Sequence, residues 1–234
     1  MGGLILLRPA AILFDLDGTL VDSVGDIADA VNTMLAQIGL PSRKDDVIRH
    51  FVGNGARMLV DRAITGTIDG GAPAAQVDGA LEIFRGMYGE CCTRRTTLMP
   101  YAHETMRALA AHGVIMSVIT NKPQAPSQQI LDHFGLSSMI ASIIGGDTLA
   151  VRKPNAITVH EALRRADLPV NATAWLIGDS QTDVLTARAA KIAAIVVRGG
   201  YNHGAPIESI DPPPDAIVSD LREVLAMYRA VLAA

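Results

Sequence analysis

Two acidic residues, Asp15 and Asp17, follow the apolar run 12–14 and are followed at once by Gly18 and Thr19. An apolar run that stops at a turn signal indicates a buried strand. Residues two apart in a strand point to the same side, so the two carboxylates should lie together and repel each other. A hard divalent cation such as Mg²⁺ would offset that repulsion. The pair therefore favours Asp15 as a nucleophile and Asp17 as a proton donor and acceptor.

Three other places in the chain put polar side chains at or beside the end of an apolar segment. Thr120 and Asn121 follow the run 117–119, Lys153 precedes Pro154 at the entrance to a predicted helix, and Asp179 follows the run 176–178. Parallel strands present their carboxyl ends at one edge of a sheet. If these strands are neighbours, that edge collects Asp15, Asp17, Thr120, Lys153, Asp179 and Asp183.

Four acids, one cation and one hydroxyl suit a phosphoryl group held beside Mg²⁺. Asp15, Asp179 and a backbone carbonyl would supply oxygens to the metal, and Lys153 would offset negative charge. The Thr120 hydroxyl would bond a phosphoryl oxygen, while Asp17 would protonate a leaving alcohol and later deprotonate water. Each feature alone has a simpler reading as a turn, a helix cap or a surface lysine. Their combination, each at a strand end, favours phosphoryl transfer through an aspartyl-phosphate.

The elements that must position these residues fall into two groups. The first strand, 11–15, is followed by residues with helical spacing and a glycine-rich loop at 65–73. From residue 97 onward, apolar strands alternate with helices. The expected helices are 26–38, 56–64, 75–91, 103–111, 126–134, 156–166, 182–190 and 221–232, and the expected later strands are 114–120, 142–144, 174–177, 192–197 and 216–218.

This alternation predicts an α/β fold, a Rossmann-like doubly wound parallel sheet with helices on both faces. The predicted α/β core is residues 1–21 and 93–234, and residues 22–92 form a helical insert after the first strand. The alternative is a separate helical domain with an unrelated role. Against it, the strand that carries Asp15 needs parallel neighbours, and only the second half of the chain supplies them.

Composition narrows the classes of function. The chain has 234 residues, 49% of them hydrophobic, and a formal net charge of −4. A full core can therefore form, and a general nucleic-acid binder is disfavoured because it would need a basic face. No apolar run approaches the ~20 residues that span a bilayer. We expect a cytoplasmic protein whose adjacent cysteines, Cys91 and Cys92, stay reduced. We also expect a monomer or homodimer that binds a small phosphorylated metabolite.

With these motifs in place, the chain resembles the haloacid dehalogenase superfamily of phosphohydrolases over nearly its whole length. The segment Asp15-Leu16-Asp17-Gly18-Thr19 is similar to the first motif of that family, Thr120 to the second, Lys153 to the third, and Gly178-Asp179-Ser180 with Asp183 to the fourth. The resemblance implies a nucleophilic Asp15, a general acid and base at Asp17, and phosphoryl contacts from Thr120, Asn121 and Lys153. It implies that Asp15, Asp179 and the backbone of Asp17 are Mg²⁺ ligands. Asp183 would support the metal indirectly, through a water molecule or a hydrogen bond to one of these ligands. The insert resembles the family's mobile cap.

Within the superfamily, the chain is most similar to bacterial phosphoglycolate phosphatases. The segments 51–60, 118–123, 145–148 and 201–204 carry this likeness. The chain departs from the pattern at Lys191, where a glycine usually ends the helix, at Ala156, where proline is frequent, and at Thr182, where asparagine is common. The resemblance implies hydrolysis of 2-phosphoglycolate.

The cap segment suggests how a substrate carboxylate could be bound. Arg57, or backbone N–H groups around Gly53, Asn54 and Gly55 at the start of a helix, would supply positive charge or donors. The simpler reading is that the glycines only shape a turn and Arg57 is solvated.

Rival functions keep parts of the same site. A phosphosugar mutase of the β-phosphoglucomutase type would keep every core residue, as would a phosphatase of another small metabolite. A haloacid dehalogenase does not have to protonate a leaving alcohol, so the presence of Asp17 argues against that function. A non-catalytic binding protein would need no nucleophile.

Overall fold

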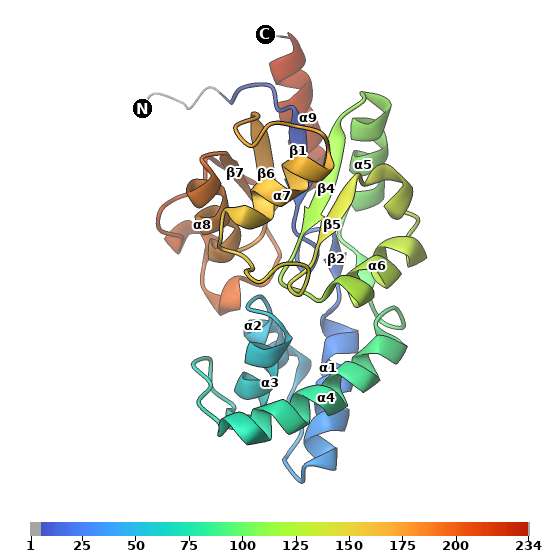
Figure 1. Cartoon of the computed structure of the whole chain (residues 1–234), viewed down its shortest axis with the longest axis vertical. Helices are drawn as coiled ribbons and strands as arrows, with labels where there is room; N and C mark the ends of the chain where they lie inside the picture. Colours follow the sequence, from blue (N-terminus) through green and yellow to red (C-terminus); the bar gives the residue numbers. More distant parts are fainter. Residues whose placement is uncertain (1–5, 234) are drawn as a thin grey trace.

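The computed structural model describes residues 6–233 (Figure 1). Within that range one parallel sheet has the strand order β5-β4-β1-β6-β7-β8. This arrangement confirms the predicted doubly wound α/β fold. The strands are β1 (Ala11–Phe14), β4 (Ile115–Ile119), β5 (Ser142–Ile144), β6 (Ala174–Gly178), β7 (Ala193–Val197) and β8 (Ala216–Val218).

Helices cover both faces of this sheet, which explains why its strands are mostly apolar. Along β1, Ile12 and Phe14 belong to one hydrophobic cluster, and Ala11 and Leu13 belong to another. This alternation is the two-residue period of a strand buried on both faces. The first cluster includes residues of α5 (Ala102–Ala111), α6 (Gln124–His133) and α9 (Leu221–Ala233), and the second includes residues of α7 (Ile157–Arg165) and α8 (Gln181–Ala190).

The central strand β1 marks the point where the direction of strand addition reverses. It pairs with β4 on one side and β6 on the other, with Phe14 opposite both Val118 and Ile177. Open α/β sheets bind their ligands beyond the carboxyl ends of the strands at such a point. Asp15 is the first residue after β1, so the fold delivers it to this position.

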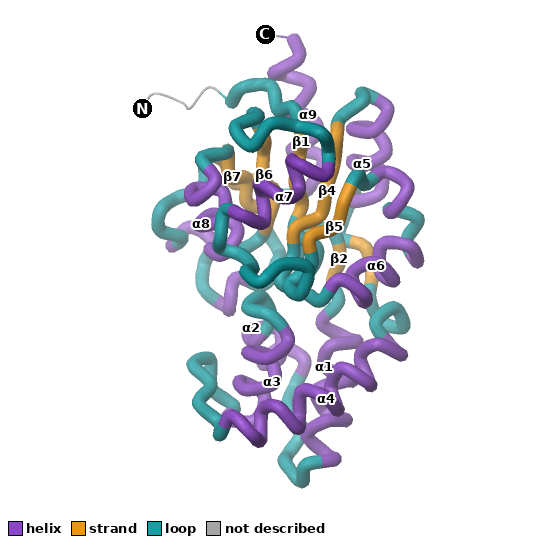
Figure 2. The backbone as a smooth tube through the Cα atoms, in the orientation of Figure 1, coloured by secondary structure: helices purple, strands orange, loops and turns teal. Residues whose placement is uncertain are grey.

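The helices of the insert leave and rejoin the core through one short ribbon. Strands β2 (Val21–Asp22) and β3 (Thr97–Leu98) pair antiparallel, and the four helices lie between them in sequence. Figures 1 and 2 show these helices gathered beyond one end of the parallel sheet. They are α1 (Val24–Gln37), α2 (Asp45–Phe51), α3 (Ala56–Thr65) and α4 (Ala74–Cys91).

Most predicted elements are present with ends shifted by one or two residues, but α2 and the β2–β3 ribbon were not expected from the sequence. The strand predicted over 114–120 is β4, so Thr120 follows the strand. The helix predicted from 126 begins at Gln124, because Pro126 lies in the first turn, where a missing backbone N–H costs nothing. The boundaries of the insert at 22 and 92 stay a prediction.

Short 3₁₀ turns complete the described chain: η1 (Ser137–Met139), η2 (Asn202–Gly204) and η3 (Ile207–Ser209). Over residues 6–233, none of the helices combines the length and the apolar character needed to cross a membrane.

Candidate active site

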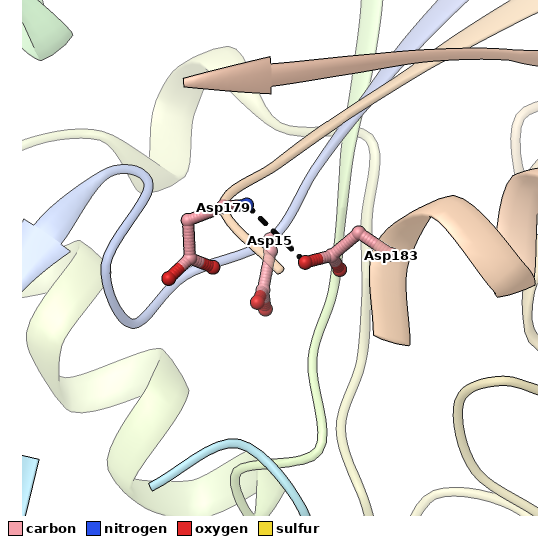
Figure 3. A group of neighbouring side chains, drawn as sticks. All are labelled: Asp15, Asp179 and Asp183. Carbon is pink, nitrogen blue, oxygen red and sulfur yellow. Dashed lines mark hydrogen bonds between the residues drawn. The ribbon is translucent and has the colours of Figure 1, made fainter. Parts of the chain in front are cut away.

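Three carboxylates meet at the carboxyl edge of the sheet. Asp15 follows β1, Asp179 follows β6, and Asp183 lies in the first turn of α8. All three are buried, and one oxygen from each lies within 4.8 Å of the others. Figure 3 shows Asp15 between Asp179 and Asp183, with the Asp183 carboxyl group directed toward it. Asp179 and Asp183 thus share one site with Asp15, although they follow it in the chain by 164 and 168 positions.

Asp183 is fixed by the start of α8. Its carboxylate accepts hydrogen bonds from the Ser180 hydroxyl at 2.7 Å and from the backbone N–H groups of Ser180 at 3.1 Å and Asp179 at 3.2 Å. The contact from the Ser180 N–H is one half of a capping box, and the other half is the Asp183 N–H bonded to the Ser180 side chain. The box satisfies N–H groups that a helix start leaves free. The same carboxylate therefore orders the helix and faces the site.

Lys153 supplies positive charge between two of the acids. Its ammonium nitrogen lies 2.9 Å from Asp15 Oδ1 and 2.6 Å from Asp183 Oδ1, and its side chain is 2% exposed. Burial alone would lower the pKa of Lys153, but the charges of Asp15 and Asp183 outweigh burial and raise it. Lys153 is therefore a permanent cation beside the proposed nucleophile.

One ammonium does not balance three buried acids. Burial raises the pKa of Asp15 to about 6, against the lowering effect of Lys153. Burial also raises the pKa of Asp179 well above its ordinary value, and the charges of Asp183 and Asp15 add to this. The donor set consists of carboxylate oxygens, which are hard ligands, so a divalent cation such as Mg²⁺ fits both the chemistry and the excess negative charge.

Asp179 is held by a close backbone approach from the loop after β7. The backbone N–H of Tyr201 donates to Asp179 Oδ2 at 2.6 Å. A Cβ at Gly200 would lie 2.2 Å from Asp179 Cβ and 2.3 Å from Oδ2, far inside van der Waals contact. Only glycine leaves room for this carboxylate at its present position.

Asp17 has separate partners from Asp15. Its two oxygens lie 2.8 and 2.9 Å from the ammonium of Lys122, and Oδ1 also accepts a hydrogen bond from the Ser23 hydroxyl. Its side chain is 12% exposed. The two acids of the first motif therefore sit in different charge environments, Asp15 against Lys153 and Asp17 against Lys122.

Thr120 and Asn121 line the same region. The Thr120 hydroxyl accepts a hydrogen bond from the backbone N–H of Lys122 at 3.2 Å. The Asn121 side-chain amide donates to the carbonyl oxygens of Gly53 at 2.9 Å and Lys153 at 3.2 Å. Asn121 thereby joins the core to the loop between α2 and α3.

A cavity of about 300 Å³ lies between the strand ends and the insert. Asp15, Asp17, Thr120 and Asp179 line its core side, and residues of the insert close the other side. Gly55 belongs to its wall. Asn54 and Arg57 do not: the Arg57 guanidinium forms an ion pair with Asp78, and its side chain is 46% exposed. The structure thus does not bring Arg57 to the cavity.

A sequence model for haloacid dehalogenase-like hydrolases matches residues 12–197, a range that includes Asp15, Lys153, Asp179 and Asp183. This chain belongs to that family. A phosphoglycolate phosphatase from Pseudomonas syringae is 40% identical over 218 residues, which are 93% of this hydrolase and 79% of the relative. One from Colwellia psychrerythraea is 39% identical, covering 88% of this hydrolase and 92% of the relative. A Haemophilus somnus crystal structure, described as a predicted phosphoglycolate phosphatase, aligns with a TM-score of 0.85 at 31% identity over 96% of this chain and 99% of its own.

The family and these relatives make the hydrolase a phosphatase, an enzyme that cleaves phosphoric monoesters. The resemblance inferred from the sequence is thereby confirmed.

Sequence reasoning missed two residues of this hydrolase that the structure brings to the site. Lys122 contacts Asp17, and the signal was a cation that directly follows Thr120 and Asn121 at the end of the same strand. Tyr201 contacts Asp179 through its backbone and Asp22 through its hydroxyl, at 2.9 Å. No pattern in the sequence shows that the loop after β7 passes beside Asp179.

Proposed function

We propose that this phosphatase is Mg²⁺-dependent and hydrolyses 2-phosphoglycolate through an aspartyl-phosphate on Asp15. The observation that carries the proposal is the place of Asp15, buried at the reversal point of the sheet, 2.9 Å from Lys153 and beside Asp179 and Asp183. The substrate rests on the relatives named phosphoglycolate phosphatase.

The proposed Mg²⁺ ligands are Asp15, Asp179 and the backbone carbonyl of Asp17, with Asp183 close by. When bound, the ion would neutralise the carboxylates and stabilise negative charge on the phosphoryl oxygens. Lys153 and the Thr120 hydroxyl would bind those oxygens from the protein side.

The reaction then runs in two displacements on this chain's own residues. A carboxylate oxygen of Asp15 forms a bond to phosphorus as the bond from phosphorus to the ester oxygen breaks, and Asp17 gives its proton to the leaving glycolate oxygen. Asp17 next takes a proton from a water molecule whose oxygen attacks phosphorus. The bond between Asp15 and phosphorus breaks, inorganic phosphate leaves, and both acids return to their starting states.

We propose that the insert 22–92 acts as a cap that excludes bulk water from the reacting groups. Contacts across the boundary support a closed arrangement. The Arg49 guanidinium of α2 lies 4.9 Å from the centroid of the Tyr201 ring, and His203 Nδ1 lies 3.0 Å from the carbonyl oxygen of His50. Together with Asn121 and Gly53, these contacts hold the insert over the cavity.

We place the enzyme in the cytoplasm as a monomer or homodimer. Its adjacent cysteines, Cys91 and Cys92, are both buried as free thiols, in keeping with a reducing compartment.

The test is a phosphate-release panel with and without Mg²⁺ over 2-phosphoglycolate, sugar phosphates and nucleotides, with Asp15→Asn as the inactive control. We expect 2-phosphoglycolate to give the highest kcat/KM, only with the metal and only in the parent enzyme. Equal rates on all esters would defeat the substrate assignment. Turnover of sugar phosphates that requires a bisphosphate and releases no phosphate would instead indicate a mutase.

A further inference from the structure

Lys122 is a buried cation at the junction of the nucleophile's strand end, the cavity and the insert. Its side chain is 4% exposed, and its ammonium contacts both oxygens of Asp17. The same ammonium lies 4.7 Å from the centroid of the Tyr88 ring, which α4 brings from the insert. A lysine ammonium has three N–H donors, of which the two Asp17 oxygens occupy two, and the ring adds a cation–π contact.

The cavity wall offers few alternatives for binding an anion. Among the described residues that line it, Lys122 and Arg85 are the cations. The Arg85 side chain is 55% exposed and pairs with Glu82 at 2.8 Å. Lys153 faces Asp15 and Asp183 instead and serves the phosphoryl group.

The apolar insert side of the wall favours a buried cation as the partner of an acidic substrate. Ile27, Leu59 and Phe84 line the insert side, and apolar surroundings penalise a carboxylate that has no charged partner. In 2-phosphoglycolate, a single CH₂ separates the carboxylate from the ester oxygen that Asp17 must reach. The cation that receives this carboxylate must therefore lie beside Asp17, which is the position of Lys122.

We propose that Lys122 is the specificity-determining residue that receives the substrate carboxylate, and that it does so by exchanging Asp17 for the substrate. This inference rests on the proposed function. In the structure, the Asp17 carboxylate occupies the anion position on Lys122. When the substrate carboxylate takes that position, Asp17 keeps its Ser23 contact and is released toward the ester oxygen. An ester without a carboxylate leaves the ion pair in place, so it loses both a binding contact and the release of Asp17.

The experiment compares two esters that differ at this one group, 2-phosphoglycolate and ethyl phosphate, in the full-length enzyme with saturating Mg²⁺. The measured quantity is the ratio of their kcat/KM values. In Lys122→Met we expect the ratio to fall about 10- to 100-fold, as for the loss of a hydrogen bond to a charged group. In Lys122→Arg, which keeps the charge, and in Arg85→Met, which alters the exposed cation, the ratio should stay close to the parent value. Product inhibition by glycolate should weaken in Lys122→Met in parallel.

The outcomes separate the role of Lys122 from the substrate assignment. If Lys122→Met lowers both kcat/KM values equally, Lys122 only positions Asp17, and the proposal is overturned. A ratio that falls in Arg85→Met instead would move the carboxylate site to Arg85. A parent enzyme that does not prefer 2-phosphoglycolate would overturn the proposed substrate and the carboxylate role together. Should Lys122→Met fail to fold, Lys122→Gln provides the same comparison.

Discussion

Replacing Gly200 by alanine should damage the active site without straining the backbone. The new Cβ would lie 2.2 Å from Asp179 Cβ, whereas ordinary van der Waals contact begins at 3.4 Å. The two segments must therefore separate by about 1.2 Å (3.4 minus 2.2). A misplacement of ~1 Å in a catalytic constellation costs about 100-fold in rate, which corresponds to ~2.7 kcal/mol of transition-state stabilisation. We expect kcat/KM for 2-phosphoglycolate to fall by that factor in Gly200→Ala.

The assay is phosphate release at saturating Mg²⁺, accompanied by thermal unfolding. Gly79→Ala is the matched control, because Gly79 lies in α4 and an added Cβ there meets nothing within 4 Å. That variant should keep its activity and gain up to about 1 kcal/mol of stability from improved helix propensity. Parent-like kcat/KM in Gly200→Ala would refute the reasoning, since it would mean that Asp179 need not stay where the Tyr201 N–H holds it.

Three further predictions concern the cap of a helix, the insert and the metal. Lys191 ends α8 with φ 57°, so Lys191→Gly should raise the melting temperature by about 1–2 °C, while Lys191→Ala, which keeps the left-handed strain, should not. Burial would raise the pKa of Asp22, but its contacts with Arg49 and Tyr201 outweigh burial and lower that pKa. The ionised carboxyl therefore stabilises the fold at pH values above its unfolded pKa of 3.8. This stabilisation is lost as the pH falls through the lower pKa of the folded state. Asp22→Asn should therefore lower the melting temperature at pH 6 and have much less effect near pH 3; an equal loss at both would contradict the ion pair. Treatment with EDTA should abolish phosphate release, and added Mg²⁺ should restore it, because within residues 6–233 Lys153 is the one cation that pairs with the cluster of three acids.

The sequence was enough to predict the doubly wound sheet because its strands are mostly apolar and alternate with segments of helical spacing. It was not enough to predict β2 and β3, which are two residues each and become strands only by pairing with each other. Asp26 illustrates the same limit. From spacing it is one more residue of a helix, but it is buried and accepts hydrogen bonds from the backbone N–H groups of Arg95 and Thr96, both at 2.8 Å. Such contacts join segments about 70 residues apart and leave no local pattern.

The candidate site also contains residues that the sequence could group correctly and one that it could not place. Asp15, Lys153, Asp179 and Asp183 could be grouped from sequence because each stands at or near the end of a strand or the start of a helix, and the topology brings these ends together. Arg57 was grouped with the cap's substrate contacts by charge alone, yet the orientation of α3 directs it to Asp78. Charge identifies a residue that could bind an anion, but only packing decides which way a surface helix presents it.

The β2–β3 ribbon gives the insert a single point of attachment at which its two ends lie side by side. A segment that begins and ends at the same place can be lengthened, shortened or exchanged without changing which strands of the sheet are neighbours. The aspartates and Lys153 lie outside that segment, while Tyr88, Phe84 and Leu59 lie within it. Replacement of one continuous stretch of chain would therefore reshape one wall of the cavity and leave Lys122, Lys153 and the aspartates in place.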